Sequence, residues 1–292
     1  MSDESHPAAA MNLAVDCHAH VFLHALAFAP DRRYTPDYDA PVDSYLARLD
    51  RHGLSHGILV QPSFLGTDNS YLLGALAACP ARLRGIAVVP VEVPRAALDT
   101  LDRAGIVGLR LNLIGAPDPD FATPLWRRHL ADIAALGWQI EIQAEAGRLP
   151  RLLPALLDAG IAIVIDHFGK PDPALGIDDP GFRYLLGTGK TGQVRVKLSG
   201  AYRNGAGATL QDTINPLREN FGLTRLLWGS DWPHTQFETQ IGYGAARAAL
   251  DRWLPDPADR SVVLGTAPIP LFRLQPLPFD RRKPACFAYE TR

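Results

Sequence analysis

The strongest constraint on the fold is an alternation, repeated along most of the chain, between short apolar runs and longer segments with helical periodicity. The short runs are rich in Val, Ile and Leu and are apolar nearly throughout, which is typical of strands covered on both faces. Between them, apolar residues recur at positions i, i+3 and i+4, as on one face of a helix. The candidate strands are Leu13–Cys17, Gly57–Gln61, Gly85–Pro90, Val107–Leu111, Trp138–Gln143, Ile161–Asp166, Val194–Leu198 and Leu226–Gly229.

The helical segments carry boundary signals as well as periodicity. The clearest are Val42–His52 and Leu125–Leu136, each followed directly by a glycine, Gly53 and Gly137. Glycine at this point suits the left-handed residue that ends many helices. With Gly242–Trp253 as the last main helix, the pattern gives eight strand–helix pairs. Such alternation predicts a parallel sheet, and this number of units predicts a closed barrel.

The fold expected is therefore α/β, a single (β/α)8 barrel of the TIM type. A chain of 292 residues suits one such barrel, which typically needs about 250 residues. We expect the barrel to span residues 12–274, with a flexible N-terminus at 1–11 and a C-terminal tail at 275–292. An open doubly wound sheet is the competing fold, but no GxGxxG motif follows the first candidate strand.

Composition narrows the partners and the compartment. Lys plus Arg number 29 against 31 Asp plus Glu, a formal net charge of −2, so neither nucleic acid nor an anionic membrane is the expected partner. No apolar run approaches the ~18 residues of a membrane span. The N-terminus lacks a basic region followed by an apolar run, so we expect a cytoplasmic protein. The cysteines are Cys17, Cys79 and Cys286, without a CxxC, which predicts neither a disulfide framework nor a cysteine zinc site.

Residues able to do chemistry lie at the ends of three candidate strands. His18 and His20 follow the first, His167 ends the sixth and Asp231 ends the eighth. Taken singly, each histidine is more often a packed or surface residue, and Asp231 could simply make a turn. Barrel enzymes, however, place their reactive groups at the C-terminal ends of strands. The coincidence of all four at that end therefore predicts an active site.

The motifs around these residues carry a family resemblance. They are the His18-Ala19-His20 pair, IDHFGKP at 165–171 and WGSDWPH at 228–234. Together they resemble the amidohydrolase superfamily and, within it, the 2-pyrone-4,6-dicarboxylate lactonase-like branch. The likeness runs from about residue 14 to about residue 272. It extends to Tyr34-Thr35-Pro36, Val60–Ser63, Gly66–Asn69 and Gly108–Asn112.

The resemblance implies a hydrolase that opens a lactone or a similar cyclic ester. Asp231 matches the general base that takes a proton from the attacking water. His18, His20 and His167 match the groups that surround the carbonyl oxygen and stabilise the oxyanion. Elementary chemistry agrees, since water needs a positioned base and a tetrahedral intermediate needs donors aimed at its negative charge.

The resemblance also implies a set of substrate contacts. Arginine suits a substrate carboxylate, because its planar fork donates two parallel hydrogen bonds. The resembled branch carries another Arg shortly after the one that matches Arg110, where this chain reads Leu113–Pro117. We therefore expect a smaller or singly charged lactone rather than the pyrone dicarboxylate. The expected substrate-binding residues are Tyr34, Ser63, Arg110, Gln143, Arg203 and His234.

The residue at the end of the fifth candidate strand indicates whether the protein needs a metal ion. Metal-dependent amidohydrolases usually have another His at its end, where this chain has Gln143. The resembled branch lacks that His too and works without metal, so we expect no cofactor. If Zn²⁺ or Mn²⁺ were bound, Glu145 could replace the missing ligand. The other ligands would then be His18, His20, His167 and Asp231.

Three functional hypotheses follow. The first is a lactone hydrolase acting on a small lactone or carboxylate, with neither nucleic acid nor membrane as partner. The second is a metal-dependent decarboxylase or another hydrolase of the same superfamily. The third is a non-catalytic barrel that binds a small carboxylate. The barrel class permits either a monomer or a homodimer. A last candidate, Lys197 on the seventh strand, is expected to neutralise a carboxylate or to lie near the barrel mouth.

Overall fold

The computed structural model describes residues 13–205, 210–277 and 286. Its eight strands form one parallel sheet in the order β1 to β8. Every predicted strand is present, with boundaries shifted by no more than a few residues. The expectations for 1–11, and for most of 275–292, lie outside the described residues. The strands are β1 Val15–Ala19, β2 His56–Val60, β3 Leu83–Ala87, β4 Ile106–Asn112, β5 Gln139–Gln143, β6 Ala162–Ile165, β7 Val194–Leu198 and β8 Leu226–Trp228.

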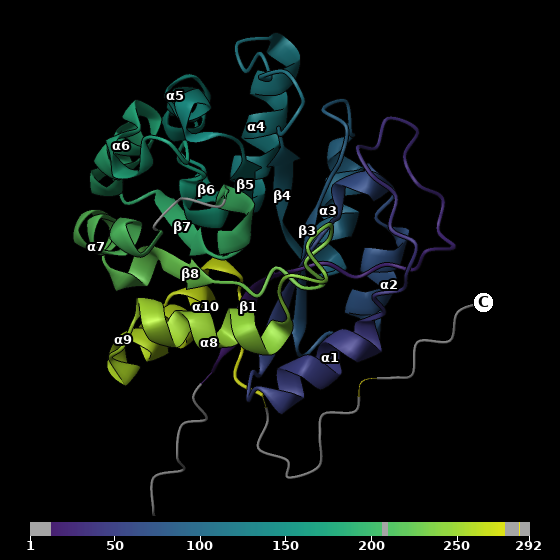
Figure 1. Cartoon of the computed structure of the whole chain (residues 1–292). Helices are drawn as coiled ribbons and strands as arrows, with labels where there is room; N and C mark the ends of the chain where they lie inside the picture. Colours follow the sequence, from purple (N-terminus) through teal and green to yellow (C-terminus); the bar gives the residue numbers. More distant parts are fainter. Residues whose placement is uncertain (1–12, 206–209, 278–285, 287–292) are drawn as a thin grey trace, which may run out of the picture.

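The helices follow one another around the outside of the strands (Figure 1). This arrangement confirms the single (β/α)8 barrel. In the described part of the chain, none of them is long and apolar enough to cross a membrane. They are α1 Val42–Arg51, α2 Ser70–Ala78, α3 Arg95–Arg103, α4 Pro124–Leu136, α5 Leu149–Asp158, α6 Pro180–Thr188, α7 Leu210–Phe221, α8 Tyr243–Trp253, α9 Pro257–Ser261 and α10 Pro268–Leu271.

The barrel closes where the C-terminal ends of its first and last strands meet. The His20 N–H donates to the Trp232 carbonyl at 2.7 Å, and the Asp231 N–H donates to the His18 carbonyl at 2.8 Å. Ala19 and Trp232 form a parallel bridge between these two hydrogen bonds. This closing contact between β1 and the segment after β8, the seam of the barrel, thus places residues some 210 positions apart in the chain next to each other.

An irregularity in β1 aims His18 into the barrel. The pairing of β1 with β2 shifts register between Asp16 and Ala19. Cys17 belongs to the apolar cluster inside the barrel, yet the side chain of its neighbour His18 contacts Lys197, which also points inward. Regular alternation forbids two consecutive inward side chains, and a bulge permits them. The bulge is therefore what turns His18 inward directly after Cys17, and alternation then turns His20 inward as well.

The barrel interior is apolar at one end and polar at the other. Its closed end is filled by branched side chains such as Val15, Ile58 and Val164, together with Phe272 from the segment after α10. Toward the C-terminal ends of the strands, the interior holds fully buried Glu141 and Lys197 instead. A polar layer at this end is expected in a barrel enzyme, because reactive groups collect there.

The cysteines depart from the expectation in one respect. Cys79, directly after α2, forms a disulfide with Cys286, while Cys17 is free and buried. The spacing of 207 residues between the two bonded cysteines gives no sequence signal of pairing. The prediction that there is no cysteine zinc site is not tested by this bond.

Candidate active site

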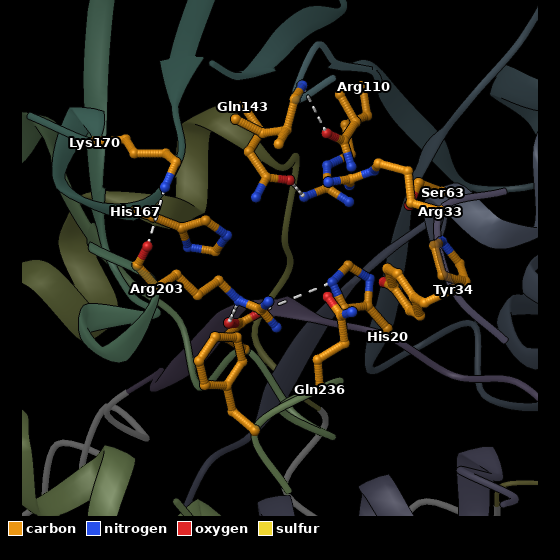
Figure 2. A pocket seen from close by; sticks show the side chains of 15 residues that line it. His20, Arg33, Tyr34, Ser63, Arg110, Gln143, His167, Lys170, Arg203 and Gln236 are labelled. Carbon is orange, nitrogen blue, oxygen red and sulfur yellow. Dashed lines mark hydrogen bonds and ion pairs between the residues drawn. The ribbon is translucent and has the colours of Figure 1, made fainter. Parts of the chain in front are cut away.

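A pocket of about 180 Å³ opens at the C-terminal ends of the strands. Its polar side chains converge on a common space (Figure 2). Eight of the predicted site residues line it directly, and the other lining residues were not predicted from the sequence. The lining residues are His20, Arg33, Tyr34, Pro62, Ser63, Arg110, Asn112, Ile114, Gln143, His167, Lys170, Arg203, Asp231, Gln236 and Phe237.

Two predicted residues lie just outside this lining. His18 is fully buried, and its ring centroid is 5.0 Å from those of both His20 and His167. It therefore forms the floor beneath the pocket. His234 is also buried, and its ring packs edge-on against Tyr202. Its place in the structure is behind the pocket wall.

Asp231 has one occupied oxygen and one open oxygen. Its Oδ2 accepts hydrogen bonds from the Tyr202 hydroxyl and the Arg203 Nε, both at 2.5 Å. Its Oδ1 has no hydrogen-bond partner within the described residues. That oxygen lies 3.8 Å from His18 Nε2 and 3.7 Å from His20 Nε2. A buried carboxylate oxygen without a donor, facing a polar pocket, is ready to accept a proton or a hydrogen bond from a bound molecule.

Hydrogen bonds between the turn after β8 and other elements fix Asp231 in this orientation. The buried Asp16 carboxylate accepts hydrogen bonds from the Ser230 N–H at 2.8 Å and the Ser230 hydroxyl at 2.6 Å, and from the Tyr243 hydroxyl at 2.9 Å. The turn after β8 is thereby tied to both β1 and α8. Asp231 itself has φ 60°, a left-handed conformation that is uncommon outside glycine and concentrates at functional sites.

A glycine lets His167 and Asp231 approach each other. A Cβ at Gly200 would lie 2.6 Å from His167 Nδ1 and 2.9 Å from Asp231 Oδ2. Gly200 also has φ +55°, which side chains rarely adopt. Any larger residue after β7 would therefore push the two groups apart.

The electrostatic surroundings keep Asp231 ionised. Burial alone would raise the pKa of its carboxyl group, but the Arg203 guanidinium and the nearby imidazoles outweigh burial and hold the pKa well below its usual range. The carboxylate is thus the reactive form at neutral pH. Its tight pairing with Arg203 also makes it a weaker base than a free carboxylate.

The histidines of the pocket are neutral. Burial, reinforced by Arg110, lowers the pKa of His20 to about 3. Burial likewise lowers the pKa of His167 to about 4. Each ring has a defined partner at Nδ1: the Val60 carbonyl at 2.7 Å for His20, and the Ser199 hydroxyl at 2.9 Å for His167. Because a carbonyl only accepts, His20 carries its proton on Nδ1 and presents a lone pair at Nε2.

These shifts predict an acid-labile fold. Between pH 6.5 and about 4, the unfolded chain protonates His20 and His167 while the folded chain keeps them neutral, since each pKa is lowered on folding. The unfolded state then binds more protons, so the free energy of unfolding falls as pH falls. The slope contributed is at most about 1.4 kcal/mol per pH unit for each histidine.

Urea unfolding at half-unit steps from pH 7.5 to 4 would measure this slope. His167→Asn removes one titrating group and should flatten the dependence in that window. The same slope in the variant and the natural protein would show that His167 does not contribute.

Arg110 and Gln143 form a polar wall of the pocket. The Arg110 Nη2 donates to Gln143 Oε1 at 2.6 Å and lies 3.4 Å from Asp166 Oδ2. Tyr34 and Ser63 face them from the loops after β1 and β2 (Figure 2). The substrate-facing side of the pocket thus combines one guanidinium with amide and hydroxyl groups, a set suited to a carboxylate and ring oxygens.

Two further cations line the pocket that the sequence motifs did not single out for it. Arg33 precedes Tyr34, and its Cδ would lie 3.4 Å from a Cβ at Gly115, so it rests against the β4–α4 loop. Lys170 follows the His167 turn and donates to the Arg203 carbonyl at 3.0 Å. Asp231 is the single acidic residue among the lining residues. Four cations against one carboxylate favour an anionic ligand.

A buried ionic cluster lies beneath the histidines. Lys197 Nζ contacts Glu141 Oε2 at 2.6 Å, His18 Nδ1 at 2.9 Å and Asp166 Oδ1 at 3.4 Å. Lys197 therefore neutralises buried carboxylates, the first of the two alternatives expected for it. Burial raises the pKa of Glu141 even beside this lysine.

The described residues offer possible ligands for a divalent metal ion. Two groups of side chains have ligand atoms close enough to share an ion: His18, His167 and Asp231 above, and His18, Glu141 and Asp166 below. Geometry alone would allow either. In the lower group, however, the Lys197 ammonium already contacts all three side chains. In the group His18, His167 and Asp231, the carboxylate has only one oxygen, Oδ1, without a hydrogen bond from the described residues, so it offers at most one ligand atom.

Comparison with known proteins places this site in a family context. Residues 15–274 match the amidohydrolase family model Amidohydro_2. The chain is 32% identical to a 4-sulfomuconolactone hydrolase from Rhizobium radiobacter, with 89% of each chain covered. It is 33% identical to a 2-pyrone-4,6-dicarboxylate hydrolase from Comamonas testosteroni, covering 78% of this chain and 79% of that one.

A solved structure agrees with these relatives. It is described as a probable 2-pyrone-4,6-dicarboxylic acid hydrolase from Acinetobacter baumannii with citric acid bound. It is 42% identical to this chain, superposes with a TM-score of 0.86 and covers 89% of this chain and 99% of its own. The barrel, the ordered motifs and the family match over nearly its whole length show that this chain belongs to the amidohydrolase family.

Proposed function

We propose that this protein is a hydrolase that opens a small anionic lactone, with Asp231 as the general base. The observation that carries the proposal is the open Oδ1 of Asp231, buried, ionised and facing two imidazole nitrogens within 4 Å. A carboxylate in this setting can take a proton from water as it attacks. The relatives named for lactone hydrolysis, at 32% and 33% identity, support the same reaction class.

The proposed reaction has two steps. Water attacks the lactone carbonyl carbon while Asp231 Oδ1 takes one of its protons, and the carbonyl oxygen becomes an oxyanion. The tetrahedral intermediate then collapses, the ring C–O bond breaks, and the proton on Asp231 passes to the departing ring oxygen. Asp231 thus returns to its starting state, and the product is the ring-opened hydroxy acid, whose new carboxylic acid group then releases its proton to solvent and becomes a carboxylate.

The histidines take different roles in this scheme. With its proton on Nδ1, bonded to Val60, neutral His20 can only accept at Nε2. It is therefore assigned to hold the second hydrogen of the attacking water, 3.7 Å from Asp231 Oδ1. His18 and His167 remain as the groups assigned to the oxyanion. This division refines the expectation that all three imidazoles donate to that oxygen.

Anion recognition is assigned to two guanidinium groups, Arg110 on β4 and Arg33 on the β1–α1 loop. Arg110 donates to the neutral Gln143 amide at 2.6 Å and forms a longer ion pair, at 3.4 Å, with Asp166. Arg33 lines the pocket and has no ion-pair partner in the described part of the chain. Arg33 rests against the loop in which the resembled branch carries its second Arg. The positive charge missing from that loop is thus supplied from the β1–α1 loop. We therefore extend the expected substrates to lactones with two acidic groups.

The proposed chemistry needs no metal ion, because Asp231 is already ionised and water is oriented by two acceptors. A metal-dependent decarboxylase of the same superfamily is the alternative, and a non-catalytic carboxylate-binding barrel is another. Among the described residues, the donor group His18, His167 and Asp231 is the feature that would suit the metal-dependent alternative.

The test is a hydrolysis screen of muconolactones, sugar lactones and pyrone carboxylates, in one- and two-acid forms. Acid release is followed with EDTA, with added Zn²⁺ and with added Mn²⁺. Turnover of at least one anionic lactone in EDTA is expected. Acid release that appears only with metal would favour a metal-dependent hydrolase, CO₂ release that needs metal would favour the decarboxylase, and binding without turnover would favour the non-catalytic barrel.

A further inference from the structure

The Lys197 ammonium occupies the centre of a buried polar cluster. Lys197, Glu141 and His18 are fully buried, and Asp166 is 2% exposed. The ammonium nitrogen is 2.6 Å from Glu141, 2.9 Å from His18 Nδ1 and 3.4 Å from Asp166. A cation with three N–H groups thus faces three acceptors, as a small metal ion would.

The contact with His18 has one consequence for that ring. An ammonium group carries donors and no lone pair, so the His18 Nδ1 that it contacts must supply the lone pair. Asp166 Oδ1 also lies 3.3 Å from Nδ1 and interacts with the ring electrostatically, but this longer contact does not have the geometry of a hydrogen bond among the described residues. The closer Lys197 contact therefore decides the tautomer, and the single proton of neutral His18 is on Nε2.

We infer that Lys197 is a positioning residue that fixes His18 in the Nε2–H tautomer, which makes His18 a donor into the pocket and prevents it from binding a metal ion there. His18 Nε2 is buried, lies 3.8 Å from Asp231 Oδ1 and has no partner among the described residues. A donor in that position can meet an oxyanion. This catalytic half of the inference rests on the proposed function, whereas the metal half does not.

The same contact explains why the upper donor group does not fit a metal. A ligating imidazole must offer a lone pair, and in metalloproteins its other nitrogen usually donates to a carboxylate or carbonyl. His20 has that arrangement, with Nδ1–H donating to Val60. In His18 the arrangement is reversed, because Nδ1 accepts from Lys197 and Nε2 carries the hydrogen. In the group His18, His167 and Asp231, His18 thus points its Nε2–H, and not a lone pair, at the position that a metal ion would occupy.

Removing Lys197 should reverse the tautomer, because Asp166 remains beside Nδ1 and can then accept its proton. Lys197→Met keeps the length of the side chain and removes the charge. Since that variant leaves buried Glu141 unpaired and could unfold, Lys197→Met/Glu141→Gln removes both charges together. Lys190→Met, at an exposed lysine after α6, is the matched control.

Two measurements report on the structure directly. Two-bond ¹⁵N–¹H spectra of ¹⁵N-histidine protein, with His18 assigned through a His18→Asn variant, should show Nε2–H in the natural protein and Nδ1–H in the double variant. Calorimetric titration with Zn²⁺ alone should show about a 10–100-fold gain in affinity for the double variant, lost again when His18→Asn is added. Lys190→Met should match the natural protein in both.

Kinetics then test the catalytic half. On a lactone found in the screen, the double variant in EDTA should lose about 10²–10³-fold in kcat, as for loss of one oxyanion donor. KM should change little, because the donor acts on charge that develops only in the transition state. A merely structural role would instead lower the fraction of active protein and leave the tautomer unchanged.

Each contrary result has a definite meaning. An Nδ1–H signal for His18 in the natural protein would overturn the inference, as would an unchanged tautomer in the folded double variant. A reversed tautomer without zinc uptake would overturn the claim that the tautomer excludes the metal. Failure of every lactone in the screen would count against the proposed function alone, since the spectra and the zinc titration need no substrate.

Discussion

Asp231→Asn is expected to lower kcat for lactone opening by about 10²–10⁴-fold, the usual contribution of a general base. The amide keeps the size of the side chain and an acceptor for Tyr202 and Arg203, which both bond to one oxygen. It has no carboxylate to take the proton of water at the open Oδ1 position. Steady-state hydrolysis, with circular dichroism as the check on folding, measures the effect.

The control for this variant is Asp158→Asn, an exposed carboxylate at the end of α5, far from the pocket lining. It should retain the activity of the natural protein. A folded Asp231→Asn protein with full turnover would show that another group activates the water, and the assignment of Asp231 would then be abandoned.

Arg203→Met is expected to change both the rate and its pH dependence. The guanidinium is the main cationic neighbour that lowers the pKa of Asp231. Without it, the lowering effect on that pKa is weaker while burial still raises it, so the carboxylate becomes protonated at a higher pH than in the natural protein. Because only the ionised form is a base, the rate of the variant should fall as pH drops through the raised pKa, where the natural protein is still active.

The variant also loses a charge-assisted hydrogen bond to the substrate or to Asp231. Loss of such a bond costs about 10–10²-fold in kcat/KM near neutral pH. Initial rates from pH 4.5 to 9 separate the two effects, with Arg252→Met at an exposed position of α8 as the control. An acid limb at the same pH in variant and natural protein would mean that Arg203 does not set the basicity of Asp231.

Sequence reasoning reached the fold because its signals are local. In the run Val194–Leu198 an apolar residue stands at every second position, and the structure assigns that strand with the same bounds. Where a strand end lacks a turn signal, the boundary moved: the run predicted at 85–90 is the strand Leu83–Ala87. Periodicity identifies the existence and type of an element better than its ends.

The meeting of the site residues followed from a rule about barrels, but their individual geometry did not. His18 reaches the interior only through the bulge in β1, and no residue type at this point of the sequence predicts a bulge. Asp231 adopts φ 60° without being glycine, a conformation held by contacts with residues more than 200 positions away. Long-range contacts of this kind leave no pattern in the nearby sequence.

The cations of the pocket show a similar limit. Arg33 was one arginine among many in the sequence, and only its place against Gly115 in space brings it to the pocket wall. The sequence places Lys197 near the end of a strand, but its contact with His18 joins β7 to β1. The sequence motifs therefore identify the reacting groups, but not the cations that bind the substrate or orient those groups.

The closing seam of the barrel ties activity to the end of folding. His18 and Asp231 become neighbours only when the first and last strands pair, and this contact has one of the largest sequence separations in the chain. Contacts of such separation have the highest entropic cost and form late. A chain with seven strands in place would bury most of its core and yet have no base beside its histidines. Recovery of activity during refolding would therefore report ring closure, whereas recovery of helical structure would report the earlier steps.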